Sequence, residues 1–130
     1  MKTPLELTIQ TISKIKEQHK PPYTLFCSGG VDSQSMLYAW YLSDIPFNLI
    51  TFRYVDNEHN TLNKNDDCYI GAFAKHLNIP LTVIEHNPLA FFEKDLIEYA
   101  LNKNVTIVGP SQLYFLIIFK LLLLFTDLFL

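Results

Sequence analysis

Cysteine and arginine are scarce in this chain, and each scarcity excludes a class of protein. The two cysteines, Cys27 and Cys68, lie far apart and form no C-x-x-C pair, which argues against a zinc ribbon, an iron–sulfur cluster and a disulfide scaffold. Arg53 is the single arginine and the formal net charge is −3, so the basic face of a general nucleic-acid-binding surface is missing. Residues 1–20 are rich in polar side chains and contain no apolar leader, and we expect a cytoplasmic protein.

The length of 130 residues allows one domain with a hydrophobic core, and a hydrophobic content of 49% is ordinary for a globular chain. Short apolar stretches alternate with longer stretches of helical periodicity, which predicts an α/β fold. Strands are predicted at 23–27, 47–54, 81–85 and 105–108, and helices at 4–20, 31–42, 62–77 and from 87 onward. A broad apolar face on the second helix is assigned to the core, made by Met36, Leu37, Trp40 and Tyr41.

The first strand runs directly into a glycine turn followed by a helix, with the sequence Ser28-Gly29-Gly30-Val31-Asp32-Ser33. Adjacent glycines allow unusual backbone conformations and close approach of a ligand. The amide N–H groups that begin a helix have no partner within it and lie at its positive end, so a phosphate fits there. Ser28 and Ser33 add hydroxyl donors, and Asp32 is assigned as a magnesium ligand or a helix cap. We predict a phosphate-binding turn, the alternative being an ordinary turn between strand and helix.

This turn resembles the PP-loop of the N-type ATP pyrophosphatases. It is not a Walker A loop, because no Gly-Lys-Ser/Thr follows the glycines. The superfamily includes the synthetase domains of asparagine synthase, GMP synthetase and NAD synthetase, 7-cyano-7-deazaguanine synthase and tRNA-modifying ligases. The resemblance in layout covers residues 22–113 and is nearest to small asparagine synthase-like domains. It implies a Rossmann-like (HUP-type) parallel sheet with strand order 3-2-1-4 and helices on both faces.

The resemblance also implies an activity and a set of site residues. ATP and Mg²⁺ bind, ATP is cleaved between its α and β phosphates, and a second, unidentified small molecule is adenylated for amide or C–N bond formation. The turn Ser28–Ser33 then holds the phosphates, with Asp32 and Ser33 in catalytic roles and Asp32 as the metal ligand. Phe52 and Arg53 flank the nucleotide at the end of the second strand. Further contacts come from the exit of the fourth strand, at Gly109 and Ser111.

Departures from the resemblance keep three functions open. In asparagine synthases the turn after the fourth strand is acidic, whereas here it reads Gly109-Pro110-Ser111-Gln112. One candidate is an asparagine synthase-like enzyme. A second is a 7-cyano-7-deazaguanine synthase-like or tRNA-modifying ligase, although such ligases usually carry cysteine pairs that this chain lacks. The third is a non-catalytic nucleotide-binding module or a truncated enzyme.

Three residues each allow two interpretations of their role. Arg53 is a ligand for a phosphate or a carboxylate, or else a surface arginine. His59 stands between Asp56 and Glu58, but the spacing fits no zinc signature. Cys27, just before the glycine turn, is assigned as a small buried residue and not as a nucleophile.

The chain closes on an apolar stretch at residues 113–130, interrupted by Lys120, Thr126 and Asp127. We therefore divide the chain into an ATP-binding domain at 1–112 and an apolar helix at 113–130. A membrane-spanning helix needs about 20 apolar residues, and a central charge costs about 2.5–3.5 kcal/mol on insertion scales. We expect a helix buried in the core or pairing two copies in a homo-oligomer, in preference to a membrane span; the third alternative is a reading frame truncated or shifted near Tyr114.

Overall fold

The structure is a computed structural model that describes residues 1–102, apart from the side chains of Asp95, Ile97, Tyr99 and Ala100. The chain divides into two units, Met1–Leu89 and Ala90–Leu130. The predicted fourth strand, with Gly109 and Ser111 after it, and the apolar helix at 113–130 lie outside the described residues.

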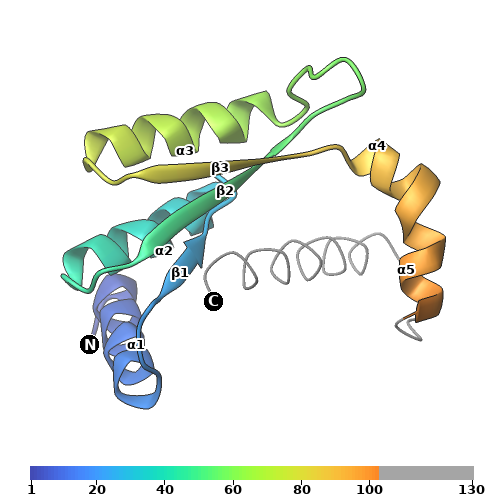
Figure 1. The fold of residues 1–130 in the computed structure, drawn as a ribbon. Helices are drawn as coiled ribbons and strands as arrows, with labels where there is room; N and C mark the ends of the chain where they lie inside the picture. The colour runs from blue at the N-terminus through green and yellow to red at the C-terminus, as the bar shows by residue number, and fades with distance from the viewer. Residues whose placement is uncertain (103–130) are drawn as a thin grey trace. The chain divides into compact units, whose positions relative to one another are not determined.

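A three-stranded parallel sheet forms the centre of the first unit (Figure 1), with strands β1 (Thr24–Phe26), β2 (Asn48–Tyr54) and β3 (Leu81–His86) in the order β1-β2-β3. Leu49 of β2 is in register with Leu25 of β1 and with Leu81 of β3. The sheet confirms the prediction of a mixed α/β fold with parallel strands. The predicted order 3-2-1-4 agrees for the three strands described, while its fourth member belongs to residues outside them.

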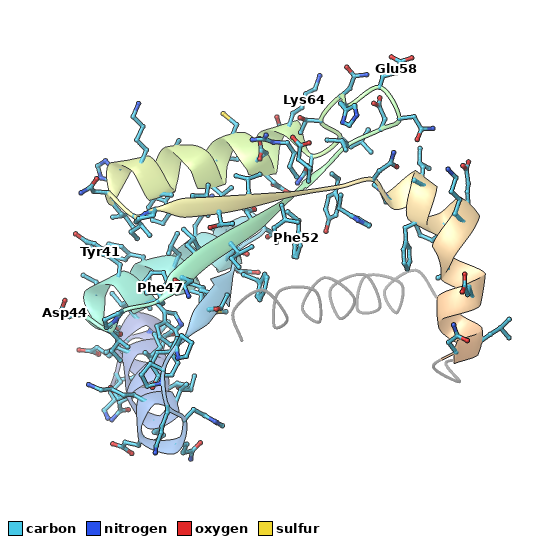
Figure 2. All side chains as sticks on the ribbon, in the orientation of Figure 1. Tyr41, Asp44, Phe47, Phe52, Glu58 and Lys64 are labelled. Carbon is cyan, nitrogen blue, oxygen red and sulfur yellow. The ribbon has the colours of Figure 1, made fainter. Side chains whose placement is uncertain are left out.

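The two ends of the sheet differ in chemistry. At the carboxyl end of β2, a polar loop that includes Glu58 leads to Lys64, where helix α3 (Lys64–His76) begins (Figure 2). At the amino end of β2 lie Asp44 and Phe47. Ligands of open parallel sheets bind beyond the carboxyl ends of the strands. The polar loop and the start of α3 therefore lie at the end of the sheet where a ligand is expected.

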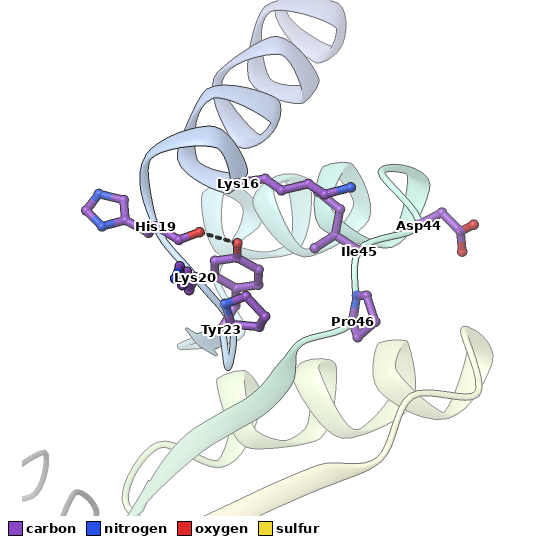
Figure 3. Close-up of a pocket in the computed structure, with 8 residues that line it drawn as sticks. Lys16, His19, Lys20, Tyr23, Asp44, Ile45 and Pro46 are labelled. Atoms are coloured by element: carbon purple, nitrogen blue, oxygen red, sulfur yellow. Dashed lines mark hydrogen bonds between the residues drawn. The ribbon is translucent and has the colours of Figure 1, made fainter.

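Helix α1 (Pro4–Gln18) begins at a capping box, in which the Thr3 N–H donates to the Glu6 carboxylate at 2.7 Å and the Glu6 N–H donates to Thr3 Oγ1 at 3.2 Å. The helix ends two residues before the predicted boundary, because His19 takes an extended backbone. After the turn, the Tyr23 hydroxyl donates to the His19 carbonyl at 2.6 Å (Figure 3). This contact ties the end of α1 to the start of β1.

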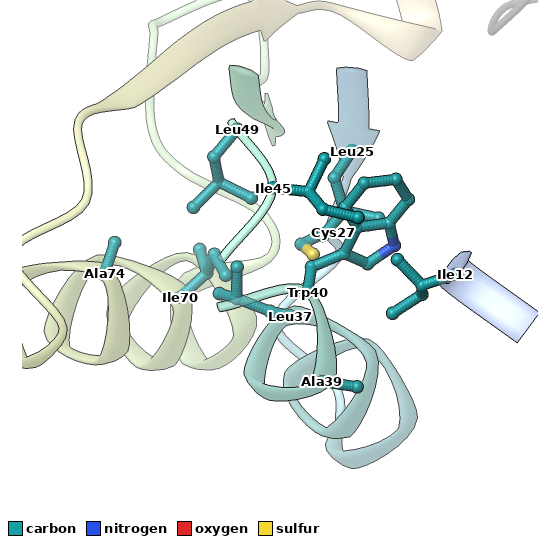
Figure 4. Close-up of a cluster of buried hydrophobic side chains, with 10 residues drawn as sticks. All are labelled: Ile12, Leu25, Cys27, Leu37, Ala39, Trp40, Ile45, Leu49, Ile70 and Ala74. Carbon is teal, nitrogen blue, oxygen red and sulfur yellow. The ribbon is translucent and has the colours of Figure 1, made fainter. Parts of the chain in front are cut away.

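Helices α2 (Val31–Leu42) and α3 pack on the same face of the sheet. Their buried side chains share one hydrophobic cluster with those of β1 and β2 and with one residue of α1 (Figure 4), namely Ile12, Leu25, Cys27, Leu37, Ala39, Trp40, Ile45, Leu49, Ile70 and Ala74. Each crossover, β1-α2-β2 and β2-α3-β3, leads to the next strand in the same direction across the sheet. Because parallel crossovers share the same handedness, both helices then lie on one face of the sheet. The predicted covering of both faces is therefore not met within Met1–Leu89.

The predicted apolar face of α2 is partly wrong, although the bounds of the helix agree with the prediction. Leu37 and Trp40 are buried, whereas Met36 and Tyr41 are 47% and 45% exposed. The ring of Tyr41 lies 6.4 Å from that of Tyr38 on the outer side of the helix. Apolar residues occur all round α2, and burial is confined to the sides that face the sheet and α1.

The helix predicted from residue 87 is divided into three parts, α4 (Pro88–Ala90), a π-helical turn η1 (Phe91–Asp95) and α5 (Leu96–Asn102). A π-helical turn changes the helical period. Phe91, at the start of this turn, is buried, while Phe92 and Leu89 are 39% and 49% exposed. No helix within residues 1–102 is long and apolar enough to cross a membrane.

Candidate phosphate-binding site

The glycine turn starts where β1 ends and is held to β2 by two hydrogen bonds. The Cys27 N–H donates to the Ile50 carbonyl at 3.0 Å, and the buried Thr51 hydroxyl donates to the Cys27 carbonyl at 2.7 Å. These two hydrogen bonds fix the start of the turn at the carboxyl end of β1, next to the central strand β2.

Gly29 is required by the fold itself. Its φ is +97°, and a Cβ added there would lie 2.1 Å from the carbonyl oxygen of Asp66 in the first turn of α3. An L side chain rarely adopts this backbone conformation, and the backbone of α3 leaves no room for one. The sequence suggested that both glycines serve a ligand, whereas Gly29 allows the turn to pack on α3.

Gly30 has no such structural requirement. Its φ of −68° and ψ of 162° suit any residue. An added Cβ would meet only the Ser28 hydroxyl at 3.6 Å, an ordinary van der Waals distance. The residue caps α2 without a side-chain hydrogen bond, although serine, asparagine and aspartate are the favoured residues there. The missing side chain therefore leaves space at the start of α2 that the protein does not fill.

Hydrogen-bond donors surround this space. The first hydrogen bond of α2 is donated by Gln34 to Gly30 at 3.0 Å, so the N–H groups of residues 31–33 precede it. The hydroxyls of Ser28 and Ser33 lie 2.8 Å apart, and each accepts a long backbone hydrogen bond of 3.3 Å. Hydroxyl hydrogens rotate to suit a partner. The turn can therefore offer helix-end N–H groups and two hydroxyls to one anion.

Asp32 is the carboxylate of this site and lies exposed in the first turn of α2. Mg²⁺ is commonly held by one or two carboxylates together with the phosphates of its nucleotide, and Asp32 fits that role as a single ligand. Within residues 1–102 no group of three or more His, Cys, Asp or Glu side chains is arranged to hold a metal ion. The second reading of His59 as a metal ligand therefore gains no support.

Phe52 and Arg53 lie on opposite faces of the sheet, because they are consecutive in β2. The Phe52 ring stacks on that of Phe26, with centroids 5.7 Å apart, on the face away from α2 and α3. On the helix face, Arg53 Nε lies 3.1 Å from Asp67 and its Nη1 lies 3.4 Å from Glu85. The hydrogen bond that Arg53 donates to Asp67 is the largest cause of a raised Arg53 pKa. These ion pairs favour a structural role for Arg53 over that of a phosphate ligand.

The polar loop after β2 is organised by Asp56. Its Oδ1 accepts the N–H groups of Glu58 at 2.9 Å and Asn60 at 2.8 Å, and its Oδ2 accepts the Asn60 side chain at 2.9 Å. The hydrogen bond from the Asn60 side chain contributes most to lowering the pKa of Asp56. Next to the loop, the Asn63 side chain receives the Tyr54 N–H and donates to the Phe52 carbonyl, each at 2.9 Å. These bonds fix the loop and delay the start of α3 by two residues relative to the prediction.

Two depressions of the surface lie at opposite ends of the sheet. One of about 430 Å³ lies at the start of α3 and is lined by residues 61–66, including the Asp66 that Gly29 contacts. The other, of about 280 Å³, lies at the amino ends of the strands between Lys16, Tyr23 and Ile45 (Figure 3). The first depression adjoins the glycine turn and the second is remote from it.

Sequence reasoning missed three residues that shape the turn, which are Gln34, Thr51 and Asp66. Gln34 donates its side-chain amide to the Gly29 carbonyl at 2.6 Å. Thr51 had a detectable signal, because it is a polar residue within an apolar strand. The contact of Asp66 is made by its backbone, and no side-chain pattern could have indicated it.

Cys27 is buried, and burial raises the pKa of its thiol from the ordinary value of 9.0 to about 11. Its thiol donates to the Ser33 carbonyl at 3.6 Å. Since the thiolate is the nucleophile, both features favour the structural assignment. Cys68, by contrast, is exposed.

We therefore expect a thiol reagent at pH 8 to modify Cys68 quickly and Cys27 slowly, with about a hundredfold less Cys27 thiolate because of the raised pKa. The native state prefers the protonated thiol, so the stability that Cys27 contributes is complete below pH 9 and is lost as pH rises toward 11. In a Cys68→Ser variant Cys27 is the one remaining cysteine, so mass spectrometry of that variant measures the modification of Cys27 alone. Rapid modification of that folded variant would contradict the assignment.

Comparison with known proteins finds no matching protein-family model and no matching curated protein. The chemistry of the site therefore has to follow from its own geometry. That geometry is a start of α2 left open by Gly30, with backbone N–H groups, two hydroxyls and the Asp32 carboxylate beside it.

Proposed function

We propose that this chain contains an ATP-binding domain of the PP-loop type. It would cleave ATP between the α and β phosphates and adenylate a small-molecule substrate for amide or C–N bond formation, as asparagine synthase-like enzymes do. The observation that carries the proposal is Gly30, where the fold tolerates a side chain and the sequence has none, beside N–H groups that precede the first bond of α2. A ligand that approaches closely supplies a reason for this glycine.

The finer fold belongs to the same proposal. A fourth parallel strand at 105–108 beside β1 would complete the Rossmann-like order 3-2-1-4. Gly109 and Ser111 would then follow a strand adjacent to the turn and lie near the ribose or pyrophosphate.

Each residue of the turn has a definite task in this chemistry. The N–H groups of residues 30–33 and the hydroxyls of Ser28 and Ser33 bind the phosphates that leave as pyrophosphate. Fixed donors stabilise the negative charge that grows there in the transition state. Asp32 would hold Mg²⁺, which supplies additional positive charge to the same oxygens.

Titration calorimetry with ATP, followed by measurement of pyrophosphate and AMP release, tests this function. We expect saturable Mg²⁺-dependent ATP binding, with pyrophosphate and AMP formed in equal amounts once the second substrate is supplied. An ATP analogue that cannot be cleaved between the α and β phosphates should bind without releasing either product. Release of ADP and phosphate in place of AMP and pyrophosphate would contradict the proposed cleavage.

Asp32→Asn separates metal binding from phosphate binding. Because the substitution removes a negative charge beside the phosphates, ATP affinity without Mg²⁺ should stay constant or rise. The gain in affinity on adding Mg²⁺ should fall by at least about fivefold, as expected for one lost charged contact worth about 1 kcal/mol or more. Equal losses with and without Mg²⁺ would instead identify Asp32 as a structural residue of the first turn of α2.

A non-catalytic nucleotide-binding module is the second candidate. It is favoured by the sequence Gly109-Pro110-Ser111-Gln112, which differs from the acidic turn of asparagine synthases. This candidate predicts ATP binding that is lost in the same turn variants, without product release for any substrate.

A further inference from the structure

We infer that Gln34 is a positioning residue, which orients the Gly29–Gly30 peptide so that its N–H, and not its carbonyl, faces the anion space. This inference rests on the proposed function. The observation behind it is the hydrogen bond of 2.6 Å from the Gln34 side-chain amide to the Gly29 carbonyl, made by a half-buried side chain.

The Gly29–Gly30 peptide needs such a restraint. Glycines on both sides allow φ of either sign, so this peptide can rotate between two orientations more easily than any other in the turn. A peptide is planar and trans, so its carbonyl and N–H point in opposite directions. With the carbonyl held by Gln34, the Gly30 N–H lies on the other side, where it donates to Ser28 Oγ at 3.3 Å.

The alternative orientation would oppose anion binding. It would direct the negative end of the peptide dipole toward the space beside the Ser28 hydroxyl, where a phosphate should repel it. The carbonyl of Cys27, the residue before the turn, likewise accepts a hydrogen bond from a side chain, the buried Thr51 hydroxyl, at 2.7 Å. Two side chains outside the Ser28–Ser33 motif thus hold one carbonyl within the turn and one at its start.

Gln34→Met tests the inference, because methionine keeps the length of the side chain and removes the donor. Loss of a hydrogen bond of ordinary strength should weaken binding of ATP and of inorganic pyrophosphate by the same factor, about threefold to tenfold. Ser35→Ala is the matched control. It removes the neighbouring hydroxyl, which bonds the Val31 carbonyl within the helix at 2.9 Å, and should leave both affinities unchanged.

Two readouts make the outcomes distinct. The first is the pair of dissociation constants, measured by calorimetry for wild type, Gln34→Met and Ser35→Ala. The second is the NMR chemical shifts of the Gly29 carbonyl carbon and the Gly30 amide, measured without ligand, which should change in Gln34→Met beyond the changes in Ser35→Ala.

Changed shifts together with equal losses for ATP and pyrophosphate would support the inference. A Gln34→Met variant that binds both ligands as tightly as wild type would overturn it. So would a loss confined to ATP, which would place the effect at the nucleoside. A wild-type protein that binds neither ligand would refute the proposed function itself, and the shifts alone would then report whether Gln34 orients the peptide.

Discussion

Gly30→Val should abolish detectable ATP binding while the domain remains folded. The backbone of Gly30 suits a β-branched residue, and the Cβ would lie 3.6 Å from the nearest protein atom, the Ser28 hydroxyl. The valine methyl groups, however, would enter the space assigned to the phosphates. We expect affinity to fall by more than about tenfold, equivalent to about 1.4 kcal/mol or more.

The experiment is clearest in a Gly71→Ala background. Valine is a poor N-cap residue, and the substitution should cost about 1 kcal/mol of stability. Gly71 lies within α3 with no atom within 4 Å of an added Cβ, so alanine there should restore about 0.5–1 kcal/mol. Gly71→Ala alone provides the control for ATP affinity, which should not change. A folded double variant that binds ATP normally would rule out the turn as the phosphate site.

Gly29→Ala should have the largest effect on stability. The alanine Cβ would overlap the Asp66 carbonyl oxygen at 2.1 Å, and φ is +97°. Backbone strain of about 1–3 kcal/mol adds to overpacking of about 1–3 kcal/mol, so we expect a loss of about 2–6 kcal/mol out of the roughly 5–15 kcal/mol available to a domain.

Urea denaturation followed by circular dichroism measures this loss. Gly30→Ala is the matched control, since it adds the same methyl group one residue later and should cost only about 1 kcal/mol through the cap. If Gly29→Ala and Gly30→Ala proved equally stable, the packing of the turn on α3 described here would be wrong.

The features that sequence could predict are those encoded by neighbouring residues. Apolar runs predict the positions of the three strands that the structure describes, and the residues between Gly30 and Ser43 predict α2 with its bounds. The candidate turn was recognisable because all six of its residues are contiguous. The fold class follows from this local information.

The features that sequence could not predict depend on contacts between distant residues. Gly29 contacts the backbone of Asp66, and Arg53 pairs with Asp67 and Glu85. Neither contact produces a periodic pattern. The separate roles of the two glycines therefore became visible only when α3 was placed beside the turn.

The sequence does not predict side-chain burial correctly where a helix changes its period, or where no other element packs on one side of the helix. Phe91, at the start of the π-helical turn η1, is buried while the adjacent Phe92 is 39% exposed, and the sequence pattern does not distinguish the two. Met36 and Tyr41 were assigned to the core because an apolar residue on a helix usually faces one, whereas both are exposed on the outer side of α2.

The central claim is that a nucleotide phosphate binds at the start of α2. Backbone amide chemical shifts of the full chain, recorded by NMR during titration with ATP and Mg²⁺, test it most directly. We expect the largest saturable changes at residues 28–33, with smaller changes at the start of α3. Changes centred on the remote depression around Lys16 and Tyr23, or no changes at all in the folded protein, would contradict it.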